Sequence, residues 1–200
     1  MSGLAGAIVA GGAALRFGGA PKGLHRVGGI RIIDRVAAAL RATTSELMIV
    51  SNASDASEWL PQVPVHADVR AERGSLIGIH TALTYATSGV LVVAWDMPFV
   101  SAALLQMIRD WPRGDSLAVF PEGPSGPEPF CALYTPACRP IIEAAIDAGD
   151  FRLSHLTARL AKVDVISIGE IEQLGDPATL LFNVNSPTDL ARAESIHAEC

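Results

Sequence analysis

The sequence has few cysteines and no long apolar run, and each scarcity excludes a class of protein. Its three cysteines, Cys131, Cys138 and Cys200, show no CxxC spacing, which argues against a disulfide framework and against a zinc site. We therefore expect buried or inert thiols. The apolar run at residues 4–10 is too short to span a membrane and lacks the positive flank of a signal peptide. We expect a cytoplasmic protein with no membrane partner.

Positive charge is also scarce. The 200 residues include 15 Lys and Arg against 21 Asp and Glu, a formal net charge of −6, and no long basic run occurs. Affinity for nucleic acids comes mainly from Lys and Arg on phosphates, so we expect no nucleic-acid partner, although a small anionic ligand needs only local positive groups. Half of the residues are hydrophobic, which is enough to bury a core and excludes intrinsic disorder. We expect a single domain over residues 1–200.

Short apolar runs alternate along the chain with longer stretches of helical periodicity. Strands are expected at residues 5–10, 46–51, 63–66, 90–94, 117–120, 130–134 and 163–168, and helices at 31–42, 76–86, 101–110, 136–148, 152–160 and 186–197. The Gly/Pro-rich segment 121–129 is expected to be a loop. This alternation predicts an α/β fold, with a mostly parallel sheet covered by helices on both faces. Ligands of such sheets bind beyond the carboxyl ends of the strands.

The loop after the first strand carries the clearest chemical signal. Ala10-Gly11-Gly12 is followed by Arg16 and Lys22, but neither the P-loop pattern nor GxGxxG is present. Glycines allow backbone N–H groups to approach an anion closely, and Arg and Lys add a planar fork and a mobile charge. The combination suits a triphosphate. The alternative is a surface turn with solvated charges.

The pattern from Ala10 to Lys22 resembles the signature of the nucleotidyltransferases of sugar-nucleotide and cofactor synthesis. Further matches are similar to the molybdenum cofactor guanylyltransferases in particular: Asn52, Asp68, Gly74–Ile79 (Gly-Pro-Leu-x-Gly in the family), Asp96–Phe99 (Asp-x-Pro-Phe/Tyr) and Phe182–Leu190 (Asn-x-Asn-Thr-Pro-x-Asp/Glu-Leu). Two positions depart from the family: Ser75 replaces a proline, and Glu128 takes the place of a histidine. The resemblance implies a three-layer, Rossmann-like nucleotidyltransferase fold.

The resemblance also implies an activity, which is transfer of GMP from GTP to the terminal phosphate of molybdopterin with release of pyrophosphate. Arg16, Lys22 and Asp96 are the implied catalytic residues. Asp96 ends a wholly apolar strand, where a carboxylate is well placed to hold Mg²⁺; the alternative is that it only caps the turn before Pro98. The implied nucleotide-binding residues are Ala10, Gly11, Gly12, Lys22, Asn52, Asp68, Gly74, Gly78 and Asp96.

The pterin substrate is assigned by the resemblance to Asn183 and Asn185, which point to the same side if their segment is extended. The alternative is that both residues tie down the last helix. Structural readings also stay open for Asn52 as a turn former, Asp68 as a loop carboxylate and Gly78 as a tolerated helix glycine. The resemblance further implies transient contacts with other proteins of molybdenum cofactor maturation.

Two other functions remain open from the sequence. The first is the same chemistry with other substrates, namely CTP with molybdopterin or a nucleoside triphosphate with a sugar phosphate. The second is a non-catalytic nucleotide-binding module with the same fold. Retention of Arg16, Lys22 and Asp96 favours an enzyme over such a module.

Overall fold

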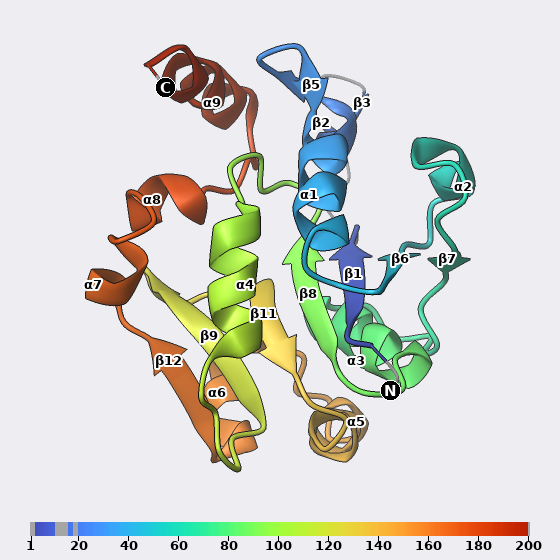
Figure 1. Ribbon diagram of the computed structural model, residues 1–200. Helices are drawn as coiled ribbons and strands as arrows, with labels where there is room; N and C mark the ends of the chain where they lie inside the picture. The colour runs from blue at the N-terminus through green and yellow to red at the C-terminus, as the bar shows by residue number, and fades with distance from the viewer. Residues whose placement is uncertain (1–2, 11–15, 18–19, 200) are drawn as a thin grey trace.

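The computed structural model describes residues 3–10, 16–17 and 20–199, and at residues 16, 17 and 20 it describes the backbone alone. A central sheet is flanked by helices on both faces, so the predicted three-layer α/β architecture is confirmed (Figure 1). Its strands are β1 (Ala5–Val9), β6 (Glu46–Val50), β7 (Val65–His66), β8 (Val90–Ala94), β9 (Ala118–Gly123), β10 (Gly126–Pro127), β11 (Cys131–Tyr134) and β12 (Val163–Ile166).

The sheet is mixed but mostly parallel, as predicted. Its order is β10-β9-β11-β8-β1-β6-β7, with β12 paired to β9. The central strand β1 is buried along its whole length and pairs in parallel with β6 and β8. Because β1, β6 and β8 run in the same direction, their carboxyl ends meet at one edge of the sheet. The antiparallel strands are β10 and β11.

Alternate side chains of the strands feed two hydrophobic cores. Ile8 belongs to the core under α1 and α4, whereas Ala7 and Val9 belong to the core under α3, α5 and α6. The two sets of helices lie on opposite faces of the sheet in Figure 1. The helices named here are α1 (Ile32–Arg41), α4 (Ala102–Asp110), α3 (Ser75–Tyr85), α5 (Cys138–Asp147) and α6 (Leu156–Leu160). The fold thus buries the continuous apolar strands that the sequence pattern indicates.

The segment 121–129 is not the plain loop that was predicted. Strand β9 continues to Gly123, and β10 pairs back on it after a turn that Gly126 closes at φ 104°. Glycine adopts this left-handed backbone without steric cost. Glu128, which follows β10, donates its backbone N–H to the Pro121 carbonyl at 2.9 Å. This hydrogen bond holds the hairpin to the sheet.

Several short elements were not predicted either. They are β2 (Arg16–Phe17), β3 (Ala20–Pro21), η1 (Lys22–Leu24), β4 (Arg26–Val27), β5 (Ile30–Arg31), α2 (Ala56–Trp59), α7 (Ile168–Ile171) and α8 (Pro177–Leu180). The strand expected at residues 163–168 ends at Ile166, because Ser167 and Glu170 form a capping box that begins α7. The helix expected at 152–160 is divided between η2 (Leu153–His155) and α6.

The C-terminal helix α9 (Pro187–Glu199) packs beside the β4–β5 hairpin. Its predicted cap is confirmed, since Ser186 Oγ accepts the Asp189 N–H at 3.2 Å. Gly28 donates its N–H to Glu194 Oε2 at 3.1 Å and leaves no room for a side chain against His197. None of the helices in the described part of the chain is long and apolar enough to cross a membrane.

Candidate active site

A cleft of about 940 Å³ opens at the carboxyl ends of β1, β6 and β8, where a parallel sheet presents its ligand site. Its lining residues are Val9, Ala10, Lys22, Val50, Ser51, Asn52, Asp68, Arg73, Gly74, Ser75, Gly78, Ala94, Trp95, Asp96, Glu128, Phe130, Asn183 and Asn185. All predicted site residues whose side chains the structure describes are among them. Gly11 and Gly12 lie outside the described residues, as does the side chain of Arg16, whose backbone forms part of β2.

Lys22, Asp96 and Asn185 form a polar cluster within this cleft. Lys22 Nζ donates to Asn185 Oδ1 at 2.7 Å and lies 3.8 Å from Asp96 Oδ2. Lys22 is only 6% exposed, and Gly23 beside it packs directly on the Trp95 ring. The Asp96 carbonyl accepts the backbone N–H of Val184 at 2.9 Å. The cluster therefore joins three segments that are far apart in the sequence.

Burial perturbs the carboxyl groups of the cleft, and Asp96 and Glu128 lie close enough to influence each other. Burial raises the pKa of Asp96, and the nearby Lys22 ammonium works against this by lowering it. Burial also raises the pKa of Glu128, the Phe130 N–H lowers it, and the negative charge of Asp96 raises it further. The cleft thus contains buried negative charge that a cation would stabilise.

A magnesium ion fits the oxygen donors of this cleft. Mg²⁺ is commonly held by one or two carboxylates, while substrate phosphates and waters complete its coordination. Asp96 supplies such a carboxylate at the end of β8. The described residues contain no group of three or more His, Cys, Asp or Glu that could hold a metal ion by itself. A metal here would therefore share its coordination with a bound phosphate.

Asn52 and Asp68 also line the cleft and form two hydrogen bonds with each other. Asn52 Nδ2 donates to Asp68 Oδ2 at 2.6 Å, and the Asp68 N–H donates to Asn52 Oδ1 at 2.8 Å. Burial raises the pKa of Asp68, and hydrogen bonds from Asn52 and Thr81 oppose this shift. The pair ties the loop after β7 to the end of β6. Contact of either residue with a nucleotide stays a prediction.

Gly74 and Gly78 allow close packing at the amino end of α3. A Cβ at Gly78 would lie 2.6 Å from Val9 Cγ1, so this glycine lets the helix approach β1. A Cβ at Gly74 would lie 2.9 Å from the Phe151 Cβ. Gly74 precedes the first residue of α3 and no side chain caps the helix there. Gly78 is thus required for the close packing of α3 on β1. It is not merely a glycine that the helix tolerates.

Asn183 and Asn185 line the cleft, and Asn185 also ties down the last helix, while contact of either residue with a pterin stays a prediction. The Asn185 side chain holds Lys22, while its backbone N–H donates to Asp189 Oδ2 at 3.0 Å and fixes the start of α9. Asn183 Nδ2 donates to the Leu181 carbonyl at 3.2 Å, and a hydrogen bond from Asn183 lowers the pKa of Glu128. Both side chains line the cleft on either side of the buried Val184.

The cleft also includes residues that the sequence did not single out. Arg73 lies beside Gly74 and Ser75, and Ser51 and Phe130 extend the walls. Arg73 directly precedes the Gly74 motif, and that adjacency is the only signal that could have found it. Trp95 is stacked on Trp59 with ring centroids 5.0 Å apart, which fixes the position of the residue before Asp96.

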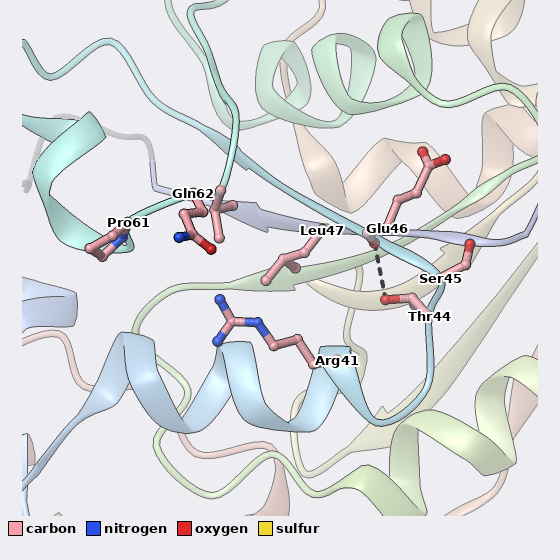
Figure 2. Close-up of a pocket in the computed structure, with 8 residues that line it drawn as sticks. Arg41, Thr44, Ser45, Glu46, Leu47, Pro61 and Gln62 are labelled. Carbon is pink, nitrogen blue, oxygen red and sulfur yellow. Dashed lines mark hydrogen bonds between the residues drawn. The ribbon is translucent and has the colours of Figure 1, made fainter.

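A second hollow, of about 330 Å³, lies at the amino end of β6 (Figure 2). It is lined by Arg41, Thr44, Ser45, Glu46, Leu47, Pro61, Gln62 and Val63. Within it Thr44 Oγ1 donates to the Glu46 carbonyl at 3.1 Å. None of the predicted site residues borders it. It also lies at the end of the sheet opposite to that at which ligands of α/β folds bind.

Comparison with known proteins agrees with this geometry. A family model described as the MobA-like NTP transferase domain matches residues 6–163. The chain belongs to this family. A molybdenum cofactor guanylyltransferase from Desulfosudis oleivorans is 30% identical over 197 residues, which cover 98% of this chain and 96% of that protein. The MobA-like chain is thus a nucleotidyltransferase, and its residues 183–185 lie beyond the part that the family model matches.

Solved structures share the fold of this MobA-like chain. Molybdopterin-guanine dinucleotide biosynthesis protein A from Archaeoglobus fulgidus superposes with a TM-score of 0.83 at 26% identity, covering 98% of this chain and 100% of that one. A Mycobacterium tuberculosis H37Rv protein solved in complex with manganese superposes with a TM-score of 0.65 at 17% identity, covering 97% and 98% of the two chains. The second likeness shows the fold alone.

Proposed function

We propose that this chain transfers GMP from GTP to the terminal phosphate of molybdopterin, releasing pyrophosphate and forming the guanine dinucleotide of the molybdenum cofactor. The observation that carries the proposal is the cluster of Lys22, Asp96 and Asn185 in a cleft at the carboxyl ends of the strands. Its support is the near full-length likeness to a molybdenum cofactor guanylyltransferase. A buried cation beside a buried carboxylate suits a phosphate substrate that arrives with a metal ion.

The phosphate-binding part of the proposal assigns one role to each charged group. Lys22 and Arg16 would bind and orient the phosphates of GTP, with backbone N–H groups of Gly11 and Gly12 close to them. Asp96 would hold Mg²⁺, which when bound supplies charge neutralisation and polarises the phosphoryl group under attack. The acceptor phosphate then attacks the α-phosphorus in line, the bond to pyrophosphate breaks, and no covalent enzyme intermediate forms.

The two walls of the cleft would hold the two organic parts of the substrates. We assign the nucleoside to the wall formed by Asn52, Asp68, Gly74 and Gly78, with Ala10 at the end of β1 beneath it. The pterin is assigned to the wall formed by Asn183 and Asn185. These two asparagines follow the part of the chain that the family model matches, as expected if the acceptor differs among nucleotidyltransferases that share one nucleotide site.

Two further expectations belong to this proposal. The chain would act as a single domain over residues 1–200, since the cleft draws on segments from Val9 to Asn185. It would also make transient contacts with other proteins of molybdenum cofactor maturation, because molybdopterin must be delivered to it and the product must be removed.

The proposal is tested by incubating the purified chain with GTP, Mg²⁺ and molybdopterin, and by measuring pyrophosphate and the guanylylated pterin. Formation of both products supports it, and CTP in place of GTP is expected to react more slowly. Faster reaction with CTP would overturn the guanylyl assignment. Absence of both products with either nucleotide, while GTP still binds, would instead point to a non-catalytic binding module.

A further inference from the structure

Glu128 is fixed at the wall of the cleft by its backbone and by one of its own oxygens. Its N–H donates to the Pro121 carbonyl at 2.9 Å, and its carbonyl accepts the Cys131 N–H at 3.2 Å. Its Oε1 accepts the Phe130 N–H at 3.0 Å, which turns the carboxylate toward the cleft that it lines. The placement is therefore built by the β9–β10 hairpin and β11.

This carboxylate lacks a positive partner. No ion pair within the described part of the chain includes Glu128, and Lys22 is already engaged with Asn185 and Asp96. Asp96 adds negative charge nearby. An ionised carboxylate offers about four acceptor positions, whereas the partners described for Glu128 are the Phe130 N–H and the Asn183 amide. A partly buried carboxylate with unfilled acceptor positions is stabilised by a ligand that brings hydrogen-bond donors.

We infer that Glu128 accepts hydrogen bonds from the ring N–H and the adjacent exocyclic amine of a 2-amino-4-oxopyrimidine ring, and that it thereby selects the pterin acceptor. The inference rests on the proposed function and names a further specificity-determining residue of that site. The two donors of such a ring edge lie side by side, so one carboxylate can accept both. The negative charge of Glu128 also repels phosphate, so the phosphates would bind at Lys22 instead.

Guanine presents the same donor edge as a pterin, so the position of Glu128 in the sheet decides between them. Asn52 follows β6, whereas Glu128 lies between β10 and β11, and β8 and β1 separate these two sides of the sheet. Asn52 and Asp68, the polar side chains of the wall assigned to the nucleoside, are thus on the far side of β1 from Glu128. Asn183, assigned to the acceptor, is the polar neighbour of Glu128.

The first test compares Glu128→Gln and Glu128→Ala with the wild-type chain in steady-state guanylyl transfer. We expect the KM for molybdopterin to rise about 10- to 100-fold, the range typical of losing one bidentate contact, with little change in the KM for GTP. Glu122→Gln is the matched control, because Glu122 belongs to the same hairpin and is not part of the cleft lining. Melting temperatures check that each variant is folded.

Each other outcome of this first test overturns the inference. A rise in the KM for GTP alone would place guanine against Glu128. A changed Mg²⁺ requirement with unchanged KM values would make Glu128 a metal-binding residue. Unchanged kinetics throughout would leave the carboxylate a purely structural role.

The second test measures binding and needs no turnover. Binding of 6-hydroxymethylpterin phosphate is compared with that of its lumazine counterpart, in which a carbonyl replaces the exocyclic amine. We expect the wild-type chain to bind the pterin at least 10-fold more tightly and Glu128→Gln to lose most of this preference. Equal binding by the wild-type chain would overturn the inference, even if guanylyl transfer occurs. Selective pterin binding without any transfer would overturn the proposed function instead.

Discussion

At the scale of single residues, the cleft depends on a buried lysine. Lys22 contacts both Asn185 and Asp96 and is almost completely enclosed. A buried ammonium is costly unless opposite charge or acceptors surround it. Folding therefore fixes the position of the Lys22 side chain before substrate binds. Phosphate binding then costs little further conformational entropy of this side chain.

Lys22→Ala is expected to lower kcat/KM for guanylyl transfer by about 10²–10³, the usual cost of removing one well-placed charge-stabilising group. The chain provides a control, because Lys162 is exposed and paired with Asp115 on the surface. Lys162→Ala should leave the rate unchanged. The measurement is initial-rate kinetics at saturating Mg²⁺, and full activity of Lys22→Ala would contradict the role given to this residue.

Asp96→Asn is expected to abolish most activity while keeping or raising the melting temperature at pH 7. Burial raises the pKa of Asp96, so the folded state binds this proton more tightly than the unfolded chain does. Stability contributed by the protonated group is present at low pH and is lost as the pH rises through the folded pKa, since the charged form opposes folding. The advantage of the variant should therefore shrink as the pH falls toward 4, measured by thermal unfolding without Mg²⁺.

Asp150→Asn is the comparison for Asp96→Asn, because the pKa of Asp150 is shifted in the opposite direction. Its hydrogen bonds with His155, Arg159 and Arg152 hold the pKa of Asp150 well below its usual range. Its stabilising contribution is present above the unfolded pKa and is lost as the pH falls through the folded one. We expect Asp150→Asn to lower the melting temperature at pH 7. Equal effects of the two substitutions would contradict the distinction between them.

At the scale of elements, long periodic segments were predictable and short ones were not. The strand Val90–Ala94 and the helix capped by Ser101 appear with the predicted bounds, because apolar runs and caps are local signals. Helix α7 has only four residues, too few to show helical periodicity. Strand β10 depends on pairing with β9 across the Gly126 turn, and its proline is a residue that normally argues against a strand.

Gly78→Val is expected to destabilise the fold by about 1–3 kcal/mol, the usual cost of overpacking, and to weaken GTP binding. The new side chain would displace Val9 and push α3 away from β1 at the floor of the cleft. Gly169→Ala in α7 is the control, because nothing lies within 4 Å of its Cβ position and no loss of stability is expected. Denaturant unfolding measures both. A Gly78→Val chain as stable as wild type would contradict the close packing.

At the scale of the whole molecule, part of the cleft lining was predictable, because Ala10, Asn52 and Asp96 follow strands whose carboxyl ends must meet. Lys22, Asp96 and Asn185 were each identified through the family motifs, but their mutual contacts required the fold. The position of Glu128 facing the cleft depends on the order of strands in the sheet, which local patterns do not encode. Arg73 has no distinguishing sequence context except the glycine that follows it.

GTP with Mg²⁺ should stabilise the whole molecule. A ligand at 100 times its Kd contributes about 2.7 kcal/mol, which for a chain of this size raises the melting temperature by roughly 5–10 °C. CTP at the same concentration is expected to give a smaller shift, and Lys22→Ala to reduce the GTP shift. The measurement is thermal unfolding at fixed Mg²⁺. An equal or larger shift with CTP would contradict guanine preference.

The hydrogen bond between Lys22 and Asn185 spans 163 residues and has a consequence for synthesis. The strands that frame the cleft are synthesised long before Asn185 is, whereas a domain generally folds as a unit. In a nascent chain the lysine therefore lacks its amide partner until the segment around Asn185 has been made. Competence to bind nucleotide would arise only as the last segments emerge, so incomplete chains would not compete with finished enzyme for GTP.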